Sequence, residues 1–119
     1  MTVYVAESSE SIMDGLSKMK AAMIDDYEKF MPPTDEIRAS MVAEFIADLT
    51  ITYGKKYIKI TEKRGGVKAF VVNVDNDKVF KKGDILKPAG YAAPARNGAR
   101  GNILEGGYPI DWTGPLYMR

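Results

Sequence analysis

The sequence contains no cysteine and no histidine. The absence of cysteine excludes disulfides, thiolate nucleophiles and thiolate zinc sites. The absence of histidine excludes catalytic triads and dyads that use an imidazole as their base. A carboxylate, a lysine or a tyrosine could still carry a reaction, but the chain has no phosphate loop, dinucleotide fingerprint or catalytic carboxylate pair. We therefore expect a protein that is not an enzyme and that uses no cofactor and no metal.

Long apolar segments are also missing. No run approaches the roughly 18 apolar residues that cross a bilayer. The first 15 residues lack the basic start and the apolar stretch of a secretory signal. We expect a cytoplasmic protein without membrane contact. The 119 residues, 45% of them hydrophobic and 28% charged, are typical of one folded domain, which we expect over residues 1–119.

The net charge of +1 hides a division between the two parts of the chain. Residues 1–50 hold four basic and ten acidic side chains, a net charge of −6. Residues 51–119 hold thirteen basic and six acidic side chains, a net charge of +7. Such a division indicates an anionic partner or a self-complementary assembly of subunits.

Two amphipathic helices are predicted in the acidic part. Between Ile12 and Phe30 apolar residues recur every three or four positions, which predicts a helix over about 9–31 that ends at two prolines. Thr34 is the predicted N-cap of a second helix, which we expect to run to about residue 50 or 53.

The period changes to two after Gly54, which predicts short antiparallel strands joined by tight turns. We expect strands at 57–61, 67–74, 78–80, 85–87 and, last, 103–104. The predicted fold class is α+β, with a helical extension over about 1–53 and a small, strongly bent antiparallel β-barrel of the Sm-like or SH3-like type over about 55–105. The loop-rich tail, 106–119, is aromatic enough that we expect it to pack on the domain or on a neighbouring subunit. The alternative is a flat meander covered by the helices.

One segment, together with the ending GPLYMR, carries a resemblance. The residues concerned are Gly83, Asp84, Ile85, Leu86, Lys87, Ala89, Tyr91, Ala93, Pro94, Ala95, Arg96, Ala99, Arg100, Gly101, Asn102 and Ile103. Over 57–119 the chain resembles a group of small uncharacterised proteins of marine tailed bacteriophages, especially cyanophages. That resemblance implies a viral source, hence the cytoplasm of an infected host cell, and no particular activity. The chain departs from that pattern at Tyr91-Ala92, where Trp-Lys is typical, and by an insertion at Asn97-Gly98.

The candidate site lies on the loop after the predicted meander and on its basic strands. The loop residues are Tyr91, Arg96, Asn97, Arg100 and Asn102. The basic residues are Lys59, Lys63, Lys81, Lys82 and Lys87. An exposed tyrosine can stack a base, and basic side chains can contact phosphates. The alternatives are a solvated sheet face with lysines guarding its edges, and a structural loop of small residues that packs between chains.

These features predict a homo-oligomeric protein that binds RNA or another single-stranded nucleic acid. The alternative is a virion, assembly or host-interaction protein, in which the acidic helices of one subunit dock on the basic sheet of the next without nucleic acid. A third class, an enzyme acting through Asp, Glu, Tyr or Lys, has no residues singled out for it.

Overall fold

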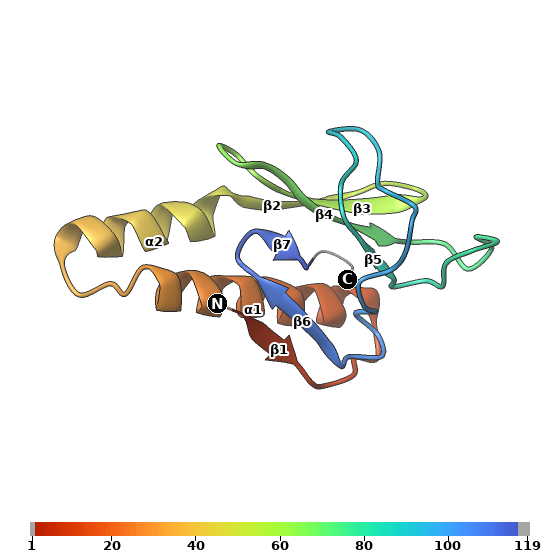
Figure 1. Ribbon diagram of the computed structural model, residues 1–119, viewed down its shortest axis with the longest axis horizontal. Helices are drawn as coiled ribbons and strands as arrows, with labels where there is room; N and C mark the ends of the chain where they lie inside the picture. Colours follow the sequence, from red (N-terminus) through yellow and green to blue (C-terminus); the bar gives the residue numbers. More distant parts are fainter. Residues whose placement is uncertain (1, 117–119) are drawn as a thin grey trace.

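The computed structural model describes residues 2–116 and has two helices and two antiparallel sheets, an α+β architecture (Figure 1). In chain order its elements are β1 (Val3–Val5), α1 (Ile12–Phe30), α2 (Glu36–Asp48), β2 (Leu49–Tyr53), β3 (Tyr57–Glu62), β4 (Gly66–Val72), β5 (Ile85–Leu86), β6 (Tyr108–Asp111) and β7 (Gly114–Pro115). One sheet has the order β1-β6-β7, and the other is a meander in the order β2-β3-β4-β5.

The predicted Sm-like or SH3-like barrel is wrong. Within residues 2–116 both sheets are open, and β2 and β5 stay at the edges of the meander. The reason is the place of α1, whose buried face shares one apolar core with both sheets. Leu16 and Met23 lie in that core together with Ile58 of β3 and Ile110 of β6. The helix therefore covers the face that a barrel would have turned inward.

β4 is buried on both of its faces. Val71 and Ala69 belong to the core around α1. Phe70 and Val72 belong to a second cluster, which Phe80 and Leu86 complete. The segment after β4 folds over this outer face, and Asp77 fixes its turn by accepting hydrogen bonds from the backbone N–H groups of Val79 and Phe80, both at 2.9 Å. The strand predicted at 78–80 is therefore a turn.

Three other element boundaries differ from the sequence-based expectation. The second helix starts after Asp35, whose carboxylate accepts from the N–H of Arg38 at 2.8 Å, rather than after Thr34. It ends at Asp48, because the β-branched residues that follow pair with β3 as β2. The residues predicted as a last strand, 103–104, form a turn.

The strand β1 was not predicted, and its partner β6 lies about a hundred residues away in the chain. Val3 pairs with Ile110 and Val5 with Tyr108. The segment predicted as a packed tail contains β6 and β7 as far as it is described, while 117–119 lie outside the described residues. Trp112 lies in the chain between β6 and β7. Its ring centroid is 5.3 Å from that of Tyr27 of α1. Tyr27 in turn stacks on Phe45 of α2 at 4.2 Å.

The helix α1 passes very close to the turn after Asn102. A Cβ at Gly15 would lie 2.7 Å from the carbonyl oxygen of Ile103. Glycine normally weakens a helix by roughly 1 kcal/mol relative to alanine. Here its missing side chain allows the close approach, because a carbonyl of the backbone has little room to move away.

We expect Gly15→Ala to lower the free energy of unfolding by about 1–3 kcal/mol in spite of the better helix propensity of alanine, because the added methyl overlaps the turn. Urea unfolding followed by circular dichroism measures this change. The matched control is Ser17→Ala at an exposed position of the same helix, which should be neutral or slightly stabilising. A Gly15→Ala variant as stable as Ser17→Ala would contradict the close contact.

Candidate functional site

A hairpin-like loop projects from the end of β5 and carries Tyr91 near its tip. Its two sides are joined by hydrogen bonds from the N–H of Ala95 to the carbonyl of Lys87 (2.7 Å) and from the N–H of Ala89 to the carbonyl of Ala93 (3.0 Å). In Figure 1 this loop stands out above the meander. The side chain of Tyr91 is 72% exposed, so the loop presents an aromatic ring to solvent on a hydrogen-bonded support.

Lys59 lies against the ring of Tyr91. Its ammonium nitrogen is 3.9 Å from the ring centroid, and 5.8 Å from that of Phe70. Lys59 is in the middle of β3, directly between Ile58 and Ile60, which point into the core on the opposite face. Strand alternation therefore places the lysine on the outer face of the meander, where the Tyr91 loop reaches it.

Two clefts flank Tyr91. One, of about 330 Å³, has uncharged walls that include Val67, Pro88 and Gly90. The other, of about 460 Å³, is polar and includes Thr61 and Lys63. This second cleft also contains two carboxylates, those of Asp48 and Glu62. Glu62 is paired with Lys68 at 2.9 Å, and Asp48 lies 4.0 Å from the guanidinium of Arg64, so both carboxylates face a cation.

Arg96 is engaged inside the fold. Its Nη2 donates to both carboxylate oxygens of Asp77, at 2.9 and 3.0 Å, and its Nη1 donates to the hydroxyl of Tyr57. The guanidinium carbon lies 4.8 Å from the ring centroid of Phe80. Arg96 therefore clamps the segment after β4 onto the outer face of the sheet through its Nη1 and Nη2 groups, while 37% of its side chain stays exposed.

The carboxyl of Asp77 is almost completely buried under this clamp, with 2% of its side chain exposed. Its pKa lies well below the usual range for an aspartate, first because of the hydrogen bond from Arg96 and then because of those from the N–H groups of Phe80 and Val79. The same pairing raises the pKa of Arg96.

Asn102 is also used inside the fold. It is 5% exposed, and its amide donates to the carbonyl of Lys82 at 3.0 Å and to Asp84 at 2.9 Å. Its side-chain oxygen accepts from the N–H groups of Leu104 and Glu105. Asn102 therefore joins two turns and has no polar atom left for a ligand.

Lys81 and Lys82 lie beside the end of β4, because the N–H of Gly83 donates to the carbonyl of Val72. Tyr91 lies by the start of β4, where it shares a cleft with Gly66. Lys81 pairs with Glu105 at 2.5 Å, and this hydrogen bond raises its pKa. Lys82 lines a separate cleft together with Tyr53 and Leu104. The structure thus divides the predicted site residues and does not bring these two lysines to the Tyr91 loop.

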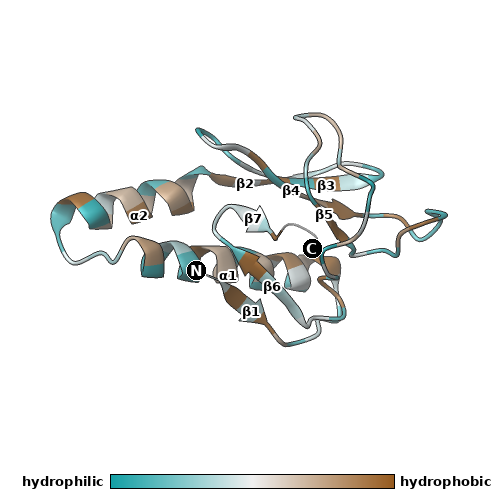
Figure 2. Ribbon diagram, viewed as in Figure 1, coloured by the Kyte–Doolittle hydropathy of each residue, from teal (hydrophilic) through white to brown (hydrophobic). Residues whose placement is uncertain are grey.

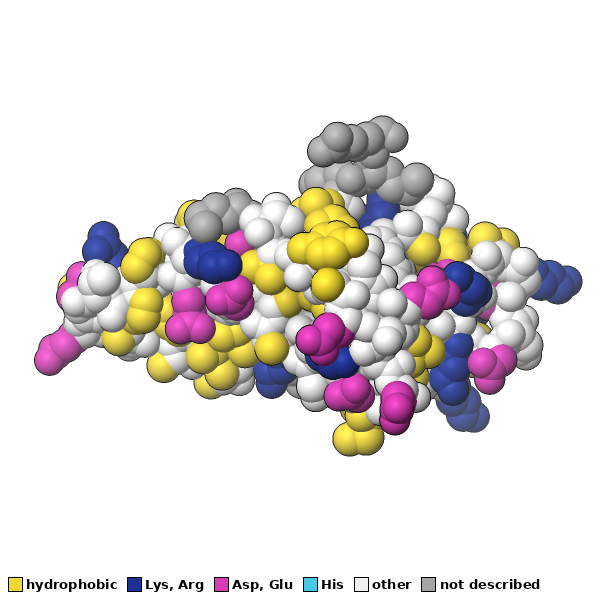
Figure 3. Space-filling view, turned by 90° about the horizontal axis from the view of Figure 1, so that it is seen from below, with side chains coloured by type: hydrophobic (Ala, Val, Ile, Leu, Met, Phe, Trp, Pro, Cys, Tyr) yellow, Lys and Arg dark blue, Asp and Glu magenta, His cyan; other side chains and the backbone are white. Residues whose placement is uncertain are grey.

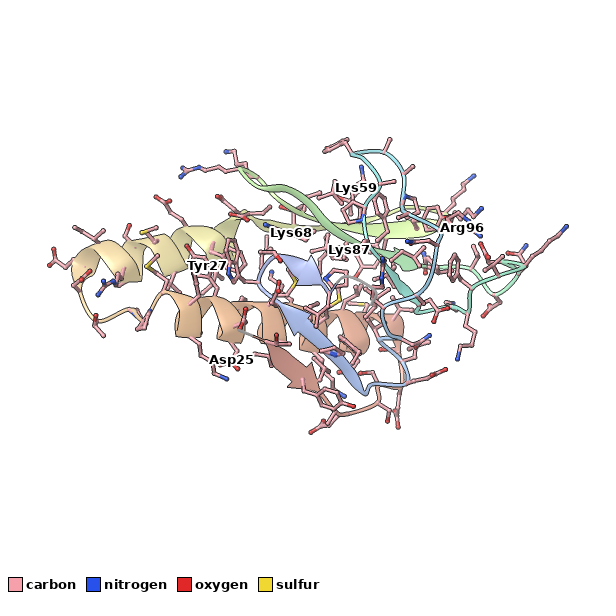
Figure 4. All side chains as sticks on the ribbon, viewed as in Figure 1. Asp25, Tyr27, Lys59, Lys68, Lys87 and Arg96 are labelled. Carbon is pink, nitrogen blue, oxygen red and sulfur yellow. The ribbon has the colours of Figure 1, made fainter. Side chains whose placement is uncertain are left out.

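A third cleft brings together Lys87, Asn97 and Arg100, all predicted from the sequence, with Lys68 and Thr113, which were not predicted as site residues. Lys68 in β4 and Lys87, which directly follows β5, both lie near β7 (Figure 4). Lys68 is a charged residue inside the apolar strand β4, and that interruption was the one signal in the sequence that could have singled it out. No sequence pattern indicated Thr113 as a site residue, because its position in the cleft depends on β7 crossing over β4.

Comparisons with known proteins give this chain no relatives. No family model matches it, no curated protein matches it, and no solved structure matches it. The bacteriophage resemblance is therefore unsupported and stays a prediction. Among the described residues no helix is long and apolar enough to cross a membrane. The same part of the chain holds no cluster of three acidic side chains that could bind a metal ion.

We expect Asp77→Asn to destabilise the protein at neutral pH, because the amide cannot form the charged pair with Arg96. The folded pKa of Asp77 is lowered, so the carboxylate's contribution is complete above its unfolded pKa of about 3.9 and is lost as the pH falls below that value. The difference in free energy of unfolding between wild type and variant should therefore be constant above about pH 5 and shrink below about pH 4.

Denaturant titrations at several pH values measure that difference. The matched control is Asp75→Asn, an exposed aspartate in the same turn region, which should change stability little at any pH. If the difference in free energy of unfolding between wild type and Asp77→Asn stayed the same from about pH 7 to about pH 3, the carboxylate charge would not support the contact with Arg96.

Proposed function

We propose that the protein binds single-stranded nucleic acid through the Tyr91 loop and the outer face of the meander beneath it. The observation that carries this proposal is the exposed ring of Tyr91 with the ammonium of Lys59 held 3.9 Å from its centroid. An aromatic ring next to a cation is the arrangement with which proteins stack a base and hold the adjoining phosphate.

The support of the ring favours binding. The loop is closed by backbone hydrogen bonds at Lys87–Ala95 and Ala89–Ala93, so little conformational entropy is lost when a base stacks on Tyr91. Stacking of one base on an aromatic side chain contributes about 1–3 kcal/mol and tolerates any base. The uncharged cleft beside Tyr91, with Val67 and Pro88 in its walls, offers an apolar surface to such a base.

The charges beneath the loop fit the same proposal. Lys59 on the outer face and Lys63 in the cleft beside Tyr91 supply positive charge, and phosphate contacts of this kind make affinity fall as salt rises. The carboxylates of Asp48 and Glu62 lie in the same region and each faces a cation, so their repulsion of a phosphate is reduced. The binding we propose is therefore weak and of low sequence preference.

We expect Tyr91→Ala to weaken binding of a fluorescent single-stranded oligonucleotide by about 10- to 100-fold, the loss of one stacked base. Lys59→Gln should also weaken binding and should reduce its dependence on salt. Fluorescence anisotropy with single-stranded RNA and DNA at roughly 50 and 200 mM salt measures both effects.

The matched control is Tyr4→Ala, because Tyr4 is 63% exposed but lies on β1 in the other sheet. This control should bind as the wild type does. Wild-type protein that binds no oligonucleotide at the lower salt concentration would overturn the proposal. An equal loss in Tyr4→Ala and Tyr91→Ala would remove the special role of the loop.

A second candidate is self-association through α2, which a separate observation favours. Ile37 is 76% exposed, and Met41 and Ile46 are each 39% exposed, although all three are large apolar side chains. Figure 2 shows brown stretches along α2, and Figure 3 shows apolar side chains gathered toward the end of the molecule that the helices form. Ile37 and Met41 lie one helical turn apart on α2 and form an exposed apolar patch, whereas Ile46 lies on the opposite side of the helix from Ile37. An exposed apolar patch is a feature of subunit interfaces.

We expect Ile37→Glu to convert an oligomer of the wild-type chain into a monomer, because the carboxylate would be buried without a partner. Size-exclusion chromatography with light scattering measures the molecular mass. The control is Met13→Glu, at an exposed position near the start of α1, which should leave the mass unchanged. A wild-type chain that is monomeric at high concentration would rule out this candidate.

A further inference from the structure

We propose that the cleft between β4, β7 and the segment after the Tyr91 loop is a binding site for a phosphate group, presented by a nucleotide whose base lies against Tyr91. The phosphate site stands on its own residues, whereas the nucleotide as its source rests on the proposed function above. The cleft has a volume of about 390 Å³. Its charged lining residues are Lys68, Lys87 and Arg100, and no carboxylate from the described residues lines it.

The close crossing of β7 over β4 forms one wall of this cleft. Gly114 has φ +119°, and a Cβ at this position would collide with the carbonyl oxygen of Lys68. Only glycine adopts this conformation without strain and also allows the contact. The crossing places Thr113 and the carbonyl of Pro115 beside the strand that carries Lys68, and Lys87 donates to that carbonyl at 2.5 Å.

Arg100 supplies the strongest indication that an anion binds in this cleft. Its backbone is held against β5, since its N–H donates to the carbonyl of Ile85 at 2.7 Å. Its side chain lines the cleft, yet its Nε and Nη1 atoms are buried and have no hydrogen-bond acceptor among residues 2–116. A buried charged donor without an acceptor is costly, and a bound oxyanion would remove that cost.

The neighbouring charges leave the cleft positive. Lys68 is neutralised by Glu62, at 2.9 Å. Lys87 is desolvated by burial, which lowers its pKa, and the charge of Arg100 lowers this pKa further, while Asp111 acts in the opposite direction. Lys87 and Arg100 are thus close enough for the charge of one to affect the other. A phosphate, with three or four acceptor oxygens and up to two negative charges, matches these donors better than a carboxylate does.

The position of the cleft indicates the source of the phosphate. Val67 and Pro88 line both this cleft and the uncharged cleft beside Tyr91, so the two clefts adjoin. A nucleotide with its base in the uncharged cleft would have its phosphate near Arg100. Asn97 is exposed at the rim and offers a further amide donor.

The experiment is a titration of the full chain with inorganic phosphate at constant ionic strength, followed by thermal unfolding and by amide NMR spectra. We expect the melting temperature to rise with phosphate, more than with acetate, and the amides of Asn97, Arg100 and Thr113 to shift. Arg100→Met should bind phosphate at least about tenfold more weakly. Without phosphate this variant should be as stable as the wild type or more stable, because the unpaired buried charge is gone.

The control is Arg64→Gln, which removes an exposed arginine paired with Glu44 and should leave phosphate binding unchanged. If Arg100→Met does not fold, the shifts of the wild-type amides decide the question by themselves. No response to phosphate, or shifts centred on lysines elsewhere on the surface, would overturn the site. An equal response to phosphate and acetate would overturn the preference for phosphate.

A second titration, with adenosine monophosphate, separates this site from the proposed function. We expect the nucleotide to bind more tightly than inorganic phosphate, with the gain lost in Tyr91→Ala. Phosphate binding without that gain would support the anion site and overturn the nucleotide as its source. Oligonucleotide binding that depends on Tyr91 but not on Arg100, in a chain that ignores phosphate, would support the Tyr91 surface and overturn the anion site.

Discussion

The apolar face of α1 is the constraint on which the rest of the structure depends. Both sheets bury their side chains against it, so β1 and β6 meet on one side while the meander packs on the other. Gly15 lets the helix approach the turn after Asn102, and that turn holds the end of the Tyr91–Arg100 segment. The helix thereby joins the two sheets in one core, and the cleft at Arg100 has lining residues from β4 and from the turn before β7.

The basic side chains fall into two groups, according to whether they pair with a carboxylate of the domain. Arg96, Lys68 and Lys81 pair with carboxylates within the domain and hold its segments together. Within the described part of the chain, Lys59 and Arg100 have no such carboxylate partner at hydrogen-bond distance. Lys59 lies on an exposed aromatic ring, and Arg100 has buried donors without acceptors from residues 2–116. A count of basic residues therefore overstates the binding surface, because many of its members have a structural role.

Several features of the fold could be predicted because they are local. The 3.6-residue period around Met19 and Met23 and the alternation around Ile58 are properties of neighbouring residues, and both elements formed. These local patterns could not show whether the meander closes into a barrel, because closure depends on whether its two edge strands pair with each other. The pairing of Val3 with Ile110 joins distant parts of the chain. A strand as short as β1 contains no local pattern that indicates its distant partner.

The sequence by itself determined that the chain has two helices, a basic meander and a loop around Tyr91, because composition and periodicity are local properties. Only the tertiary structure decided which candidate side chains remain available. Asn102 and Arg96 were sought as ligand contacts, but buried carboxylates and carbonyls claim their donors. Lys68 and Arg100 share a cleft only because β7 crosses β4, and that crossing follows from the packing of both sheets on one helix.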